Sequence, residues 1–141
     1  MYTTAIQSQD EALTHLFFHC CLKDKELADA ELETVSNKLV TVGLNKTLNF
    51  KDEIVKYREY SAEITDENEY LQYLVEQINP ANELALFSYC AELVLSDDIL
   101  APEEETLLHN IAETLGISNE EQDIVKRLMI QRKVVETDKL F

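Results

Sequence analysis

Two stretches decide the fold: LKDKELADAELETVSNKLVTVGLN at residues 22–45 and LSDDILAPEEETLLHNIAETLGIS at residues 95–118. They align without a gap at an offset of 73 residues, and 8 of the 24 positions are identical. The identities include the two glycines of the whole chain, Gly43 and Gly116, and acidic residues that helical patterning does not require. Each copy predicts the order helix, acidic loop, helix, glycine turn, helix.

The match continues after a three-residue insertion in the first copy, where EIVK at residues 53–56 aligns with DIVK at residues 123–126. Neither unit would bury its apolar face alone. We therefore expect two pseudo-symmetric repeat units, approximately 11–63 and 84–135, packed as one bundle in a single domain that covers residues 1–141.

The composition favours an all-α fold of about seven helices, because two Gly and two Pro are too few for the turns of an all-β protein. Expected N-caps are Asp10, Asp66 and Ser118, the last two with a glutamate three residues later. Pro80 is expected to open the fifth helix. Ile54, Val55 and Tyr57 are the expected core anchors of the third. The helices should cover approximately residues 11–22, 29–42, 50–63, 66–79, 80–96, 102–115 and 119–135.

The charge distribution excludes several classes of partner. The formal net charge is −16, and residues 59–123 carry 17 Asp and Glu but no Lys or Arg. Nucleic acids and anionic membranes would be repelled. The acidic surface serves solubility or, alternatively, attracts cations or a protein with a basic surface.

The two acidic loops are DKELADAE at residues 24–31 and DDILAPEE at residues 97–104. In each, an Asp ends one helix and a Glu lies seven residues later, in the first turn of the next helix. The helix dipole favours a negative charge at that position.

The second unit resembles the TerB-like domain, a family named for a tellurite-resistance protein. The resemblance rests on LSDDILAPEEETLL at residues 95–108 and AETLGIS at residues 112–118, and the first unit is a degenerate copy. The usual family loop reads Asp-Gly-x-Ile-x-Pro-Glu-Glu. Asp98 and Lys25 replace its Gly here, and Ala101 and Ala28 stand where a Ser often occurs. The resemblance implies an all-α fold with two related halves, and acidic loop residues suspected of binding a metal.

By position, the acidic pair of the family falls on Asp97 and Glu104, and on Asp24 and Glu31 in the other half. Together with Asp98, these carboxylates could hold a divalent cation if the two loops meet, because Ca²⁺ and Mg²⁺ prefer several oxygen ligands. The alternative is structural: the aspartates accept hydrogen bonds from loop N–H groups and the glutamates cap helices. Both interpretations stay open at this point.

Other candidate chemistry is weaker. His15 and His19 have a spacing that zinc sites use, but without a third ligand we expect a surface pair. Five tyrosines, Tyr57, Tyr60, Tyr70, Tyr73 and Tyr89, are expected at the edge of the core. Cys20, Cys21 and Cys90 lie in apolar helical contexts, which indicates buried thiols in a reducing cytoplasm. Nothing in the sequence indicates catalysis.

The sequence therefore predicts a non-enzymatic, cytoplasmic, TerB-like module of bacterial stress physiology. Its acidic loops would bind a divalent cation. The alternative is an acidic interaction or scaffold domain that binds a basic protein partner and no metal. Neither nucleic-acid binding nor membrane insertion is expected.

Overall fold

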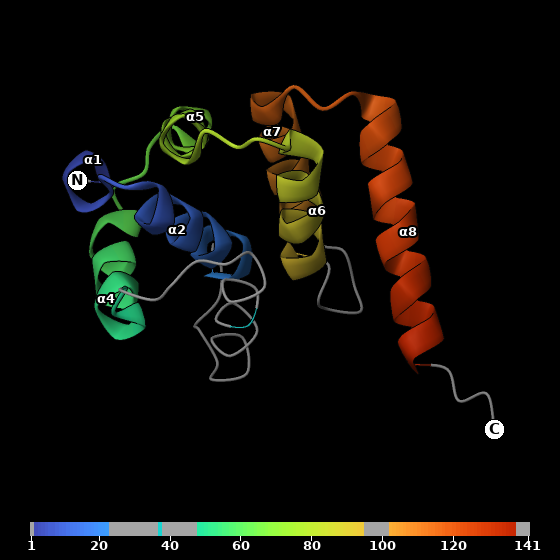
Figure 1. The fold of residues 1–141 in the computed structure, drawn as a ribbon, viewed down its shortest axis with the longest axis horizontal. Helices are drawn as coiled ribbons and strands as arrows, with labels where there is room; N and C mark the ends of the chain where they lie inside the picture. Colours follow the sequence, from blue (N-terminus) through green and yellow to red (C-terminus); the bar gives the residue numbers. More distant parts are fainter. Residues whose placement is uncertain (1, 23–36, 38–47, 95–101, 138–141) are drawn as a thin grey trace. The chain divides into compact units, whose positions relative to one another are not determined.

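The structure confirms the all-α class. A computed structural model describes residues 2–22, 37, 48–94 and 102–137, in which every element with described bounds is a helix and no strand occurs (Figure 1). The chain forms two compact units, residues 1–81 and 82–141, each with its own buried residues.

The first unit is built around α2 (Gln9–Leu22), which packs against α4 (Phe50–Ser61) and α5 (Glu67–Ile78). Every residue from 12 to 20 is buried, including three polar ones, Thr14, His15 and His19. A helix contacted by two others buries most of its circumference, so the one-sided apolar pattern expected from the sequence understates its burial.

A short helix that the sequence analysis did not predict precedes α2. This helix, α1 (Tyr2–Ala5), packs against α4, and Ile6 after it is fully buried. Tyr73 of α5 donates a hydrogen bond to the carbonyl oxygen of Ile6 at 2.6 Å. The ring of Tyr2 contacts those of Tyr60, Tyr70 and Tyr73. The N-terminal segment is therefore held to the unit by aromatic contacts and by hydrogen bonds from Tyr73 to the backbone carbonyls of Thr3 and Ile6.

The second unit consists of α6 (Glu83–Val94), α7 (Pro102–Leu115) and α8 (Asn119–Thr137), with α6 packed against both others. The buried positions of α7 follow the helical period, at Leu107, Leu108, Ile111 and Leu115. From α8, Gln122 is buried and its amide donates to the carbonyl oxygen of Ile117 at 3.1 Å.

The caps at Asp66 and Ser118 are confirmed. The Asp66 carboxylate accepts from the Glu69 N–H at 3.2 Å. Ser118 and Glu121 form a reciprocal capping box, in which each side chain accepts from the backbone N–H of the other.

Two expected helix starts and one core anchor are wrong. Ser8, not Asp10, caps α2: its hydroxyl accepts from the Glu11 N–H at 3.2 Å. Asn82, not Pro80, precedes α6 and accepts from the Ala85 N–H at 3.0 Å. Ser8 lies two residues before the expected cap, and Asn82 lies two residues after the expected helix start. In both cases the side-chain oxygen reaches a free N–H group of the first helical turn. Val55, expected in the core, is 54% exposed, and Glu53 takes the inward position instead.

The pseudo-symmetric repeat stays a prediction, because the helix expected at 29–42 and both acidic loops lie largely outside the described residues. The described part of the match shows a difference in register. Ile54 is buried and Val55 exposed, whereas the aligned Ile124 is exposed and Val125 buried. The glycine turn is described only at Gly116, since Gly43 also lies outside the described residues.

Candidate functional site

Of the five residues proposed from the sequence to bind a metal, the structure describes Glu104. Asp24, Glu31, Asp97 and Asp98 lie outside the described residues. Glu104 is in the first turn of α7, where its neighbours Glu103 and Glu105 are exposed. Glu104 is half-buried, and its Oε2 atom is inaccessible to solvent. The carboxylate therefore turns inward at a helix N-terminus, a position that suits a negative charge.

Within residues 2–22, 48–94 and 102–137, no three His, Cys, Asp or Glu side chains converge in a way that could hold a metal ion. The two acidic loops lie largely outside this range. The donors themselves are all carboxylates, which fit a hard cation such as Ca²⁺ or Mg²⁺ better than Zn²⁺.

The expected surface position of His15 and His19 is wrong. Their exposed fractions are 0% and 3%, and both side chains lie on α2 where it packs against α4 and α5. Buried polar side chains need hydrogen-bond partners, and each imidazole has one at both ring nitrogens.

The first histidine joins a tyrosine to a glutamate. His15 Nδ1 lies 2.6 Å from the Tyr60 hydroxyl, and its Nε2 lies 2.9 Å from Glu53 Oε1. Tyr60 and Glu53 are both on α4, and both are 3% exposed. The His15 and Tyr60 rings stack with an interplanar angle of 12°.

The second histidine repeats the arrangement one helical turn later. His19 Nδ1 lies 2.8 Å from the Tyr57 hydroxyl of α4, and its Nε2 lies 3.2 Å from Glu67 Oε2 of α5. We call Tyr60–His15–Glu53 and Tyr57–His19–Glu67 the histidine triads. They connect α2 to α4 and α5 through hydrogen bonds inside the first unit.

The first triad extends at both ends. At one end, Lys56 Nζ lies 2.9 Å from Glu53 Oε2 and 3.5 Å from Glu11 Oε2 of α2. At the other end, the Tyr60 hydroxyl lies 2.6 Å from that of Tyr70, which is fully buried. The result is a continuous polar chain from Lys56 at the surface to Tyr70 in the core.

Burial and hydrogen bonding set the protonation states along this polar chain of side chains. It lowers the pKa of His15, an effect that the hydrogen bond and charge of Glu53 only partly oppose. Burial also raises the pKa of the Tyr60 and Tyr70 phenols. The hydrogen bond to Glu53 raises the pKa of Lys56. Near neutral pH the imidazole is therefore uncharged, the tyrosines keep their protons, and the lysine is charged.

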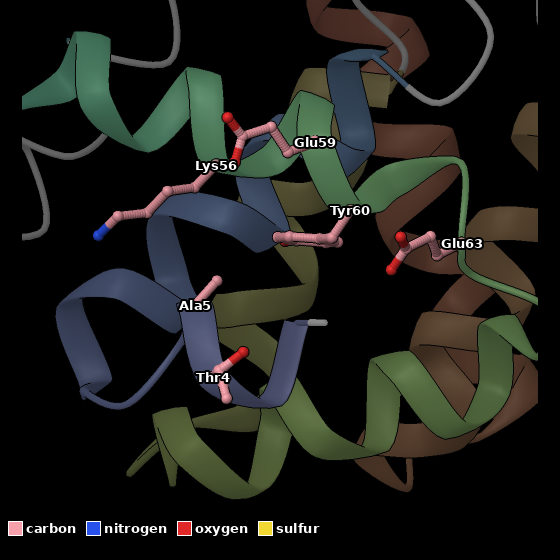
Figure 2. A pocket seen from close by; sticks show the side chains of 6 residues that line it. All are labelled: Thr4, Ala5, Lys56, Glu59, Tyr60 and Glu63. Atoms are coloured by element: carbon pink, nitrogen blue, oxygen red, sulfur yellow. The ribbon is translucent and has the colours of Figure 1, made fainter.

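An open pocket of about 390 Å³ is lined in part by Tyr60 and Lys56. Thr4 and Ala5 of α1 line one side, and Glu63 lies just past the end of α4. Figure 2 shows the Tyr60 ring between these groups, with the Lys56 amine pointing away from it. The remaining lining residue is Glu59. The Tyr60 hydroxyl is already bonded to His15 and Tyr70, so the pocket does not present it as a free nucleophile.

The comparison with known families decides the identity of the domain. The model of the family described as "Tellurite resistance protein TerB" matches residues 10–127. The chain belongs to the TerB family. No curated protein and no solved structure matches it. The matched range includes both acidic loops and both histidine triads.

None of the described helices of this TerB domain is long and apolar enough to cross a membrane. Cys20 and Cys90 are buried and Cys21 is half-buried, and none of these three described cysteines forms a disulfide. The expectation of buried thiols is confirmed for Cys20 and Cys90.

Sequence analysis missed the histidine triads of this TerB domain. It placed the tyrosines at the edge of the core, whereas Tyr57, Tyr60 and Tyr70 are buried. A signal was present: two histidines four residues apart match two tyrosines three residues apart, a spacing that puts each pair on one helix face. The glutamates of the triads reach the histidines only because α4 and α5 pack against α2. The local sequence pattern does not specify this packing.

Proposed function

We propose that this TerB chain is a non-enzymatic binding module of bacterial stress physiology, which takes up a divalent cation through its acidic loops. The ligands would be Asp24, Glu31, Asp97, Asp98 and Glu104. The observation that supports this proposal is the inward orientation of Glu104, in contrast to its exposed neighbours Glu103 and Glu105. The stress-response role is carried over from the description of the family as a tellurite resistance protein.

Removing a carboxylate from water costs free energy. A carboxylate oxygen removed from water must be compensated by hydrogen bonds, a helix N-terminus or a cation. Glu104 lies at the N-terminus of α7, and the sequence places Asp97 and Asp98 just before that helix. A cation bound there would be held by oxygens from a helix turn and the preceding loop, the donor type that Ca²⁺ and Mg²⁺ prefer.

The test is thermal unfolding in fixed monovalent salt, with Ca²⁺, Mg²⁺, Mn²⁺ or Zn²⁺ added at matched ionic strength. A site occupied only in the folded state stabilises it by about 2.7 kcal/mol at a hundred times the dissociation constant. We expect one ion to raise the unfolding midpoint well beyond the others. Asp97→Asn combined with Glu104→Gln should abolish the difference.

The matched control is Glu103→Gln combined with Glu105→Gln, which removes two charges from the same helix turn but leaves the inward carboxylate. This control should keep the ion response. If all four ions act alike, or if the Asp97/Glu104 variant still responds, the loops bind no specific cation.

The second candidate is an interaction domain for a basic protein partner. It is favoured by the absence of Lys and Arg from residues 59–123, because a field of one sign steers oppositely charged partners. Elemental analysis of the purified protein separates the two functions. A stoichiometric divalent metal supports the first, whereas a metal-free protein that retains a basic partner from a native lysate supports the second.

The histidine triads support a non-enzymatic role, although a histidine between a hydroxyl and a carboxylate is the arrangement of many nucleophilic enzymes. In such enzymes the hydroxyl must reach a substrate. In this TerB domain the Tyr60 hydroxyl is buried and bonded on both sides, and its pKa is raised by burial. We therefore assign the triads to the stability of the first unit rather than to a reaction.

A further inference from the structure

The hydrogen-bond acceptors around His15 determine which of its ring nitrogens carries a proton. Glu53 also contacts the Lys56 ammonium at 2.9 Å, so its carboxylate is ionised and can only accept. His15 Nε2 must therefore be protonated to donate to Glu53. A neutral imidazole has one N–H, so Nδ1 accepts a hydrogen bond from the Tyr60 hydroxyl.

With this assignment, the successive hydrogen bonds from Tyr70 to Glu53 all donate in the same direction. Because the hydrogen of Tyr60 points to His15, the Tyr60 oxygen accepts from the Tyr70 hydroxyl at 2.6 Å. The donors run from Tyr70 to Tyr60, from Tyr60 to His15 and from His15 to Glu53. Each buried donor has an acceptor, which is the low-energy arrangement for polar groups in a core.

Protonation of His15 is incompatible with these hydrogen-bond directions. The cationic ring has an N–H at both nitrogens, so Nδ1 must donate to the Tyr60 oxygen. The Tyr60 hydrogen then turns toward the Tyr70 oxygen, and the Tyr70 hydroxyl loses its acceptor. Tyr60 is the one hydrogen-bond partner of that hydroxyl among the described residues, and Tyr70 is 0% exposed. A buried donor without an acceptor destabilises the fold.

The second triad places the same kinds of group at the two ring nitrogens of His19. His19 Nε2 faces the Glu67 carboxylate, and its Nδ1 faces the Tyr57 hydroxyl. Both histidines are on α2, and their partners are on α4 and α5.

We infer that the Tyr60–His15–Glu53 triad, with Tyr70, is an acid-sensitive contact, which holds α2 to α4 and α5 while the His15 imidazole is neutral and weakens when that imidazole is protonated. The first unit of the domain would then loosen in mildly acidic conditions, independently of any cation at the acidic loops.

Several groups act on the charge of His15. Burial opposes protonation most strongly, Lys56 opposes it as well, and Glu53 and Glu11 favour it. The titratable and charged groups around the ring are Glu11 and His19 on α2, Glu53, Lys56, Tyr57 and Tyr60 on α4, and, through Tyr60 and His19, Tyr70 and Glu67 on α5. Their sum lowers the pKa of His15 below the ordinary value of 6.5.

The sign of the pH effect follows from this direction. The unfolded chain binds a proton at His15 more readily than the folded protein does. The contribution of neutral His15 to folding stability is therefore fully present above about pH 6.5. It is lost as the pH falls from there toward the pKa of His15 in the folded state.

The test compares wild type with His15→Gln by hydrogen exchange at backbone amides of α2, between pH 7 and pH 5, after correction for the intrinsic pH dependence of exchange. A glutamine can accept from Tyr60 and donate to Glu53, but it does not titrate. We expect the opening equilibrium of wild-type α2 to rise severalfold over this range, and His15→Gln to remove most of that rise. His109→Gln, at an exposed histidine paired with Glu113 in the second unit, is the matched control and should behave like wild type.

A second measurement on the wild-type protein keeps the proposal testable if His15→Gln does not fold. Nitrogen-15 NMR of the histidine rings at pH 7 should show neutral His15 with its proton on Nε2, and protonation should occur together with exchange broadening of the Tyr60 and Tyr70 ring signals. A proton on Nδ1 at pH 7 would overturn the proposal, as would an acid response of α2 that is the same in His15→Gln and wild type.

Discussion

At the scale of single residues, two described positions have a positive φ, and each ends a helix. Asn79 follows α5 with φ 45°, and Gly116 follows α7 with φ 74°. The Gly116 N–H donates to the carbonyl of Glu113 and the Ile117 N–H to that of Ala112, the two bonds of a Schellman motif. The glycine turn predicted at residue 116 is therefore confirmed, and Gly116 forms it in the left-handed conformation.

We predict that Gly116→Ala destabilises the protein by about 1 kcal/mol, because an L side chain at positive φ is strained. An added Cβ would meet no other atom within 4 Å, so backbone strain is the only cost. Denaturant unfolding followed by circular dichroism measures the change. Gly116→Asn should cost less, since Asn tolerates this conformation better. Equal stability of Gly116→Ala and wild type would contradict the strain argument.

At the scale of helices, α2 is held by polar contacts as well as by apolar packing. Glu53 of α4 accepts from His15 of α2 and from Lys56, and Lys56 also contacts Glu11 of α2. Gln9 at the start of α2 donates to the carbonyl oxygen of Ile78 at the end of α5 at 2.7 Å. These contacts specify which face of α2 packs against each neighbouring helix. Apolar packing alone would specify the orientation of α2 less precisely.

We predict that Glu53→Ala lowers the free energy of unfolding by about 2 kcal/mol, because it leaves the buried His15 N–H without its acceptor. Lys56 is half-exposed and its ammonium can be hydrated in the variant, so loss of the Lys56–Glu53 ion pair adds little to the cost. Glu59→Ala on the exposed face of the same helix is the control and should change stability by less than about 0.5 kcal/mol. Urea unfolding of the two variants gives both values. A similar cost for both would mean that Glu53 acts only through helix propensity.

At the scale of the whole molecule, the net charge of −16 is the dominant electrostatic feature. Like charges repel in a compact state more than in an expanded chain, so this excess destabilises the fold. Screening reduces the repulsion, because the Debye length falls from about 30 Å at 0.01 M to about 8 Å at 0.15 M ionic strength.

We therefore predict that the unfolding midpoint rises by several degrees between low and physiological ionic strength, and that NaCl and KCl act equally. Differential scanning calorimetry at a fixed pH of 7.5 measures this response. A midpoint that falls with salt would show that attractive surface pairs outweigh the repulsion. A difference between Na⁺ and K⁺ would instead indicate a specific monovalent site.

The sequence by itself determined the helical class, the family and most helix ends. The reason is that these depend on local features: helical periodicity, a capping oxygen at Asp66 or Ser118, and a glycine that alone adopts φ 74° without strain at 116. The acidic-loop site was also predicted from local residues, and of its five positions the structure describes the inward-turned Glu104.

Only the tertiary structure decided the roles of His15, His19, Glu53 and the buried tyrosines. A polar residue in a helix can face water or a partner, and residues 38 to 48 positions apart in sequence supply the partners here. Whether a histidine at such a position is a surface group or the centre of a hydrogen-bonded core depends on which helices cover it. That choice is made when α4 and α5 pack on α2 and remove its polar groups from water.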